Sequence, residues 1–169
     1  MIKGLVVGGT GNIGKLICDR LSFDSVSPSN GYKVPENLDK IIQLSYNYNV
    51  VINCIPDINQ NILLESLFEE HSKKDLDTYL ITLGSMSYKM NSSDHPKNKI
   101  LEFSESILLR KSKVKHTLIN LTWCFNNRDI DIMSVISKED IVDVFNFLIE
   151  SKDKNSVVSM IEIKGKNVL

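Results

Sequence analysis

A short apolar run that ends in glycines opens this chain, and no other feature constrains its fold as strongly. Residues 2–7 are mostly apolar, which is typical of a buried strand, and the segment Gly8-Gly9-Thr10-Gly11-Asn12-Ile13-Gly14 follows directly. Residues 12–21 then repeat apolar side chains at helical spacing. A buried strand that turns through glycines into an amphipathic helix is typical of a phosphate-binding loop, because the first N–H groups of the helix are free and carry partial positive charge.

Each glycine of this segment has a predicted role. Gly8 allows the tight turn out of the strand, Gly11 leaves room for a pyrophosphate, and Gly14 lets the helix pack closely on the sheet. The spacing Gly-x-x-Gly-x-x-Gly differs from the Gly-x-Gly-x-x-Gly of many dehydrogenases, so much of the prediction depends on the flanking strand and helix. We predict that the segment binds the phosphates of a dinucleotide through these residues: Gly8, Thr10, Gly11, Asn12, Ile13 and Gly14.

Strand-like and helix-like segments alternate along the whole chain. Strands are predicted over residues 2–7, 25–27, 50–54, 78–83, 114–121 and 156–163. Helices are predicted over residues 12–21, 36–46, 57–73, 96–110 and 137–150, the last beginning with a capping box of Ser137 and Asp140. A loop is expected over 84–96 and an irregular segment over 122–136. The alternation predicts an α/β fold of the Rossmann type, a doubly wound parallel sheet of about six strands in three layers, as a single domain over residues 1–169.

Composition excludes several other classes of protein. The 169 residues carry a formal net charge of −1, which argues against nucleic acid as the main partner. No apolar run approaches the roughly 20 residues that span a bilayer, and the N-terminus lacks the pattern of a signal peptide, so we expect a cytoplasmic protein without a membrane partner. The three cysteines and three histidines have no spacing that is typical of disulfides or metal ligands, and no metal is expected.

Several segments together resemble the short-chain dehydrogenase/reductase family. Besides the glycine segment, Val50-Val51-Ile52-Asn53-Cys54 is similar to the family strand that ends in Asn-Asn-Ala-Gly. Ile81-Thr82-Leu83-Gly84-Ser85 is similar to the strand that carries the family's catalytic serine, and Lys99-Ile100-Leu101-Glu102 to the start of its active-site helix. The resemblance implies a sheet order of 2-1-4-5-6-7, in which the family's third strand is missing between Ser27 and Val50. It makes the chain an abbreviated member.

The resemblance also implies a catalytic set that is incomplete here. The family uses a serine that orients the substrate carbonyl, a tyrosine that transfers the proton, and a lysine that lowers the tyrosine pKa and holds the nicotinamide ribose. Ser85 matches the serine and Lys99 matches the lysine, but His95 stands at the tyrosine position. Histidine transfers protons near neutral pH, and Tyr88 lies nearby in the same loop. Either side chain is therefore a candidate acid or base.

The expected cofactor is a nicotinamide dinucleotide, either NADP or NAD. The resemblance places Asn53, Cys54 and Ile55 beside the nicotinamide ribose, together with Lys99. The second strand ends without the acidic residue that binds the adenosine ribose of NAD. Three polar residues at this strand end are expected to bind a 2′-phosphate, with charge supplied by Lys33: Ser27, Ser29 and Asn30. This expectation slightly favours NADP over NAD.

Two hypotheses of function follow. The first is an NAD(P)-dependent oxidoreductase that acts on a small carbonyl or alcohol. The second is a catalytically silent relative that binds the dinucleotide as a sensor, or serves as a scaffold, because the family tyrosine is replaced by His95. In either case the resemblance implies a homo-oligomer that pairs through the helices at residues 58–73 and 96–110.

Overall fold

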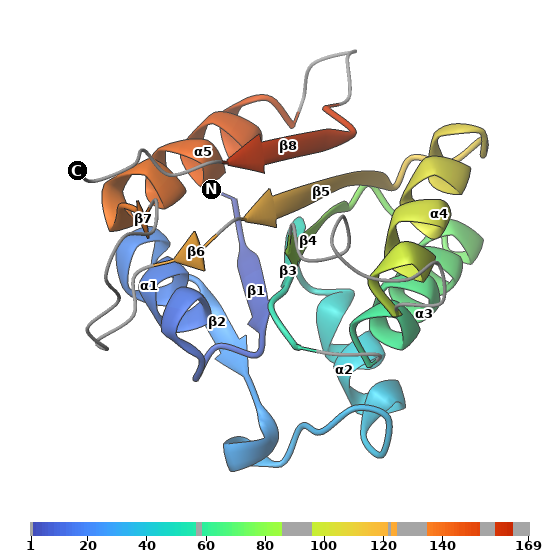
Figure 1. Ribbon diagram of the computed structural model, residues 1–169. Coiled ribbons are helices and arrows are strands. Elements are labelled where there is room, and N and C mark those ends of the chain that lie inside the picture. Colours follow the sequence, from blue (N-terminus) through green and yellow to red (C-terminus); the bar gives the residue numbers. More distant parts are fainter. Residues whose placement is uncertain are drawn as a thin grey trace.

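The computed structural model describes residues 2–56, 59–85, 96–121, 123–124, 135–152 and 158–163. The elements in chain order are β1 (Gly4–Val7), α1 (Asn12–Leu21), β2 (Asp24–Val26), a short 3-10 helix (Pro28–Asn30), α2 (Leu38–Ser45), β3 (Val50–Asn53), α3 (Asn59–Lys73), β4 (Tyr79–Ser85), α4 (Pro96–Leu108), β5 (Lys115–Leu121), β6 (Trp123–Cys124), β7 (Val135–Ile136), α5 (Lys138–Glu150) and β8 (Met160–Ile163). They form an α/β fold of the Rossmann type (Figure 1).

Six strands form one parallel sheet in the order β2-β1-β3-β4-β5-β8. This order confirms the predicted one, because β3, β4, β5 and β8 are the family's strands four to seven and the third strand is missing. The short 3-10 helix and α2 connect β2 to β3, with no strand between them. The sheet therefore ends at β2 on this side.

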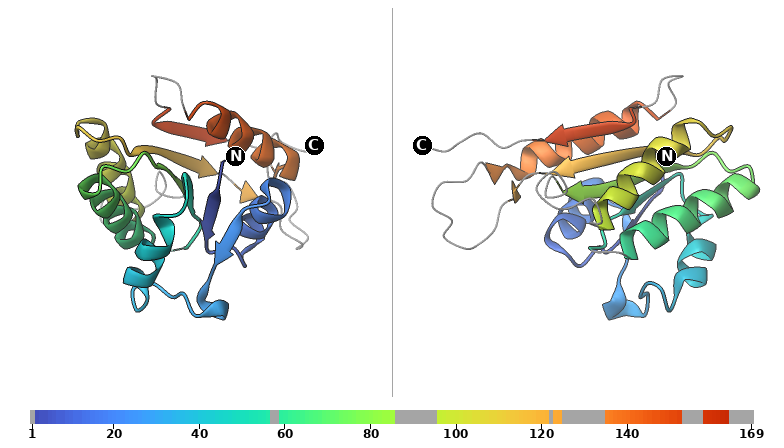
Figure 2. Two further views of the ribbon diagram at one scale, coloured as in Figure 1. Left: turned by 180° about the vertical axis from the view of Figure 1, so that it is seen from behind. Right: turned by 45° about the vertical axis from the view of Figure 1, so that its right-hand side comes forward.

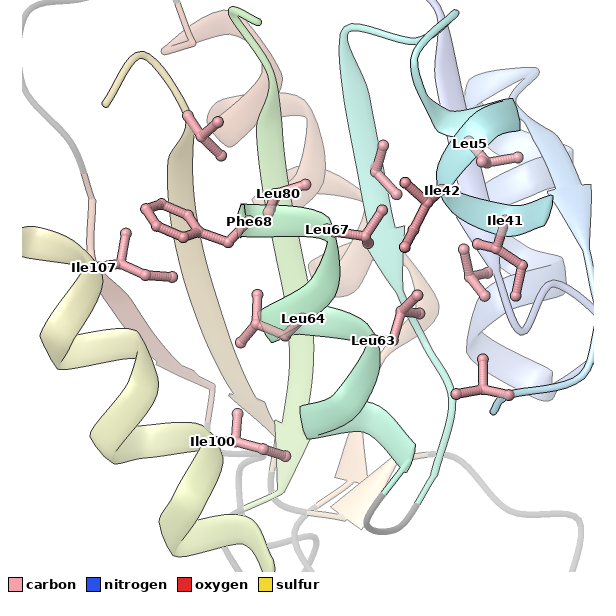
Figure 3. Close-up of a cluster of buried hydrophobic side chains, with 14 of the residues drawn as sticks. Leu5, Ile41, Ile42, Leu63, Leu64, Leu67, Phe68, Leu80, Ile100 and Ile107 are labelled. Atoms are coloured by element: carbon pink, nitrogen blue, oxygen red, sulfur yellow. The ribbon is translucent and has the colours of Figure 1, made fainter. Parts of the chain in front are cut away.

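Helices cover both faces of the sheet, which gives the three predicted layers. The helices α1 and α5 pack on one face, and α2, α3 and α4 pack on the other (Figures 1 and 2). Alternate residues of each strand enter the two cores: Val51 of β3 lies in the core under α3, whereas Val50 and Ile52 lie in the core under α1 and α5. Figure 3 shows side chains of the α3 and α4 core gathered against the sheet, among them Leu63, Leu64, Leu67, Phe68, Ile100 and Ile107.

The structure differs from the prediction in two segments. The strand β4 runs on through Gly84 and Ser85, which pair with β5, although the sequence predicted a loop from residue 84. A glycine ordinarily weakens a strand, but here Asn120 Oδ1 fills the space above it, and a Cβ on Gly84 would lie 2.2 Å from that atom. The predicted irregular segment contains β6 and β7, which pair with each other in a separate two-stranded sheet.

Other elements follow the prediction with shifted ends. The helix α2 begins at Leu38, two residues late, because Asn37 is still in the preceding turn and its side chain accepts a hydrogen bond from the Lys33 N–H (3.1 Å). The strand β8 begins at Met160. The capping box of α5 is confirmed, since the Asp140 N–H donates to Ser137 Oγ (3.0 Å). The proposed cap of α3 by Asp57 lies outside the described residues.

A buried histidine connects α2, α3 and the segment before β4. Ser45 Oγ donates to the Ile42 carbonyl (2.7 Å), so it must accept from His71 Nε2 (2.7 Å). The other ring nitrogen, Nδ1, then accepts from Thr78 Oγ1 (2.8 Å), and the ring is neutral. Burial lowers the pKa of His71 to about 4, and burial lowers the pKa of His116, which contacts Thr82, to about 3.

We predict that stability falls in mild acid because of these two histidines. In the unfolded chain both histidines have a pKa near 6.5, whereas in the folded chain the pKa is about 4 for His71 and about 3 for His116. Between these values the unfolded chain binds more protons, so the free energy of unfolding decreases as the pH falls. The slope is on the order of 2 to 3 kcal/mol per pH unit near pH 5. Urea unfolding at pH 7, 6 and 5 measures it. An unchanged slope in the double variant H71Q/H116Q would contradict the assignment.

Candidate functional site

The candidate site lies at the carboxyl edge of the parallel sheet. The strands β1, β3 and β4 all end at this edge, and α1, α3 and α4 begin there. The chain leaves β1 toward β2 on one side, and β3 pairs with β1 on the other side. Such a point, where the strand order reverses, opens a crevice outside the strand ends in which α/β proteins bind ligands. The residues predicted to bind a cofactor lie in the segments that follow β1, β2 and β3.

The glycine turn brings α1 directly against the end of β1. Gly8 has a φ of +95°, a conformation that favours glycine, and its N–H donates to the Val26 carbonyl (2.8 Å). The chain then turns back, because the Gly11 N–H donates to the Gly8 carbonyl (3.2 Å). A Cβ on Gly14 would lie 2.4 Å from that same carbonyl oxygen. The close contact predicted for Gly14 is thus with the backbone of the turn.

The first turn of α1 is open toward the crevice. Gly11 is the N-cap residue, and no side chain of the described residues caps the helix there. The first turn carries no acidic residue, and among the described residues a Cβ on Gly11 would meet only the Gly8 carbonyl oxygen, at 3.6 Å. Thr10, Gly11 and Asn12 are exposed, while Ile13 packs on the α1 and α5 core. The turn therefore presents unsatisfied N–H groups beside open space, which is what an anion requires.

The end of β3 lies against this turn. A Cβ on Gly8 would come within 3.0 Å of the Cys54 carbonyl carbon and 3.1 Å of the Ile55 nitrogen. Cys54 is half-buried, and burial raises the pKa of its thiol, so the thiol stays protonated at neutral pH. Asn53 is buried and its amide holds the backbone: Nδ2 donates to the Gln60 carbonyl (2.8 Å) and Oδ1 accepts from the Ile55 N–H (3.4 Å).

Gln60 is a site-edge residue that the sequence analysis missed. It is 3% exposed, and its Nε2 donates to the Leu83 carbonyl at the end of β4. Gln60 comes three residues before Leu63 and four before Leu64, so it lies on the same apolar face of α3. A polar residue on a face that packs against the core was the signal in the sequence that could have identified it. Its partner on β4 is 23 residues away, and no local pattern indicates that contact.

The candidate catalytic residues are only partly described. Ser85 is the last residue of β4, where its backbone pairs with Leu121. Lys99 is in the first turn of α4 and is exposed. Both segments meet the carboxyl edge of the sheet. His95 and Tyr88 lie outside the described residues, so the geometry of proton transfer is not part of the structure.

The polar residues after β2 bind one another. Ser27 Oγ lies 2.7 Å from Ser29 Oγ, and the Ser27 N–H donates to Asn30 Oδ1 (2.7 Å), closing a capping box on the short 3-10 helix. Lys33 Nζ pairs with Glu36 Oε1 at 2.5 Å, and both side chains are exposed. The structure therefore brings together the residues expected at a 2′-phosphate, but their polar atoms already have protein partners.

Comparison with known proteins shows the fold. No protein-family model and no curated protein matches the chain. A structure of serine dehydrogenase complexed with NADP+ aligns with a TM-score of 0.67 and 12% identity, over 99% of both chains. A β-ketoacyl-[ACP] reductase from Bacteroides thetaiotaomicron aligns at 0.68 with 16% identity, over 97% of this chain and 98% of that one. A 4-hydroxyisoleucine dehydrogenase complexed with NADH and succinate aligns at 0.68 with 14% identity, over 96% and 97%.

At these identities the likeness establishes a Rossmann-type fold like that of nicotinamide-dependent dehydrogenases and reductases. Among the described residues, no helix is long and apolar enough to cross a membrane. The described part of the chain also contains no cluster of three or more histidine, cysteine or acidic side chains that would hold a metal ion.

We predict that G14A destabilises the fold more than G11A does. Alanine at residue 14 would force its Cβ into the Gly8 carbonyl, so α1 must shift, and we expect a loss of about 1–3 kcal/mol in the free energy of unfolding. Alanine at residue 11 has open space and an ordinary φ of −71°, so we expect less than about 1 kcal/mol. Urea unfolding compares them. Equal losses in the two variants would contradict the assigned contact.

Proposed function

We propose that this protein binds a nicotinamide dinucleotide across the carboxyl edge of the sheet, with the pyrophosphate at the N-terminus of α1. The observation that carries the proposal is the uncapped first turn of α1 beside open space at Gly11. Free N–H groups and the partial positive charge of a helix N-terminus bind phosphate. Two neighbours in fold are complexed with NADP+ and with NADH, which supports the same ligand class here.

The proposed reaction is oxidation or reduction of a small alcohol or carbonyl. A bound nicotinamide supplies hydride transfer to or from the substrate carbon. In this proposal the Ser85 hydroxyl donates to the substrate oxygen, and His95 or Tyr88 moves the proton at that oxygen. Lys99 holds the nicotinamide ribose, and Asn53, Cys54 and Ile55 form the wall beside it. The support for these roles is that Ser85 ends β4 and Lys99 begins α4 at the same edge of the sheet.

A second candidate is a protein that binds the dinucleotide without turning it over, as a sensor or scaffold. The observation that favours it is the replacement of the family tyrosine by His95. A histidine ring is shorter than a phenol, so the proton would be delivered from a different position. Binding of dinucleotide is common to both candidates, and turnover separates them.

The proposed dinucleotide is NADP or NAD, with NADP slightly favoured. The segment after β2 carries hydroxyl and amide groups and no carboxylate before Glu36, so nothing there repels a 2′-phosphate. Asp24 is at the other end of β2, where it accepts a hydrogen bond from Tyr48 (2.9 Å). The Lys33–Glu36 pair would have to open for Lys33 to reach a phosphate.

We also propose a cytoplasmic homo-oligomer that pairs through α3 and α4. These helices pack on each other through an edge contact of Phe68 and Phe103, whose ring centroids are 6.0 Å apart. Further toward the C-terminus of α4, Leu108 at the end of the helix is 52% exposed, and Leu109 just after it is 91% exposed. Apolar side chains this exposed at the end of a helix pair are suited to burial by a second copy.

We expect the G11D variant to lose dinucleotide binding while it keeps its fold. Aspartate is a favourable N-cap and stabilises a helix start, but its carboxylate would stand where the pyrophosphate binds. Fluorescence titration with NADPH and NADH should give a Kd at least about 100-fold higher than that of the native protein. The variant G11N controls for size, since it adds the same bulk without charge and should weaken binding less. A native protein that binds neither dinucleotide at millimolar concentration would contradict the proposed function.

If the protein is an enzyme, we expect K99A to abolish turnover. Removing the ammonium group removes the contact proposed for the nicotinamide ribose, so kcat/KM should fall by about 100-fold or more over a panel of small carbonyls and alcohols. The exposed Lys40 of α2 provides the matched control, and K40A should retain native activity. Activity that persists in K99A would reject the proposed site, and binding without any turnover would favour the sensor or scaffold.

A further inference from the structure

A chain of hydrogen bonds crosses the carboxyl edge of the sheet beside the candidate site. The Ile55 N–H donates to Asn53 Oδ1 (3.4 Å), Asn53 Nδ2 donates to the Gln60 carbonyl (2.8 Å), and Gln60 Nε2 donates to the Leu83 carbonyl (2.5 Å). Asn53 and Gln60 are 2% and 3% exposed, so both amide side chains are largely shielded from water. These hydrogen bonds therefore connect the end of β3 and the start of α3 to the end of β4.

Gln60 donates a hydrogen bond to a part of β4 that has no pairing partner on β3. The last residue pair between β3 and β4 joins Asn53 to Thr82, and β4 continues beyond it from Leu83 to Ser85. A carbonyl left without a donor in a buried position costs about 1–3 kcal/mol. The Gln60 side chain reaches the Leu83 carbonyl and removes this penalty, which allows β4 to extend past the end of β3.

This series of hydrogen bonds ends at two parts of the proposed site, the glycine turn and the end of β4. At one end, the Cys54–Ile55 peptide packs against Gly8 of the glycine turn. At the other end, Leu83 is two residues before Ser85, the candidate for contact with the substrate oxygen. The position of β4 relative to the glycine turn is therefore set through Asn53 and Gln60.

We propose that Gln60 is a positioning residue that holds the end of β4 at the nicotinamide half of a bound dinucleotide. The inference rests on the proposed dinucleotide function. The adenine half of a dinucleotide lies on the other side of the turn, toward β2, and within the described residues no hydrogen bond of the Gln60 or Asn53 side chain reaches that strand. Gln60 thus acts on one half of the ligand only. A purely structural residue would affect both halves.

The experiment compares each dinucleotide with its truncated form. Titrations of NADPH against 2′-phospho-ADP-ribose, and of NADH against ADP-ribose, separate the nicotinamide half from the rest of the ligand. The variant Q60M keeps the length of the side chain and removes its donor. The exposed Gln43 of α2 gives the matched control Q43M. Thermal unfolding of each variant confirms that the domain is folded. If Q60M does not fold, Q60L replaces it, because it also removes the donor to the Leu83 carbonyl and buries no charge.

We expect the Kd of the dinucleotide to rise three- to tenfold in Q60M, as loss of one buried hydrogen bond would cause, while the Kd of the truncated ligand stays within twofold. Q43M should leave both values unchanged. Equal weakening of both ligands in Q60M, or no change in either, would overturn the positioning role while leaving the proposed function intact. If the native protein binds none of the four ligands, the proposed function fails and this inference fails with it.

Discussion

The close contact between the start of α1 and the turn after β1 is the constraint on which the rest of the structure depends. A side chain at residue 14 would overlap the Gly8 carbonyl, so glycine at this position allows α1 to begin directly behind the strand end. As a result, α1 begins at the same edge of the sheet at which β1 and β3 end. The open first turn of α1, its position at the strand ends and the packing of α1 on the sheet all follow from one backbone contact.

Polar residues gather at the carboxyl ends of the central strands, on the face that α3 and α4 cover. Asn53, Thr82 and Asn120 are each 2% exposed or less, and each has a partner on a different element. Thr82 contacts His116 at 3.0 Å, and Asn120 Nδ2 lies 3.3 Å from Met160 Sδ. Buried polar groups that are all satisfied fix one arrangement of their elements. These hydrogen bonds therefore help to fix the arrangement of the strands and helices beside the candidate site.

The glycine turn was predictable because its signal is local, whereas the sheet order was predicted from the resemblance to the short-chain dehydrogenase/reductase family. A strand, three glycines and an amphipathic helix occupy fewer than twenty consecutive residues, and the alternation of strands and helices leaves few topologies. The extension of β4 through Ser85 was not predictable, because it depends on Asn120 and Gln60, which are distant in sequence. The hydrogen bonds among Ser27, Ser29 and Asn30 were missed for a different reason. The same residue types suit both a ligand and a self-contained turn.

The sheet ends at β2, which leaves a strand edge without a neighbour in the described part of the chain. Exposed edges invite pairing with strands of other molecules, and long flat ones lead to aggregation. Here the edge strand has three residues, begins with the exposed charge of Asp24 and is followed within two residues by Pro28, which has no N–H to donate. Tyr48 also binds Asp24. The sheet edge at β2 therefore carries its own protection against edge-to-edge association.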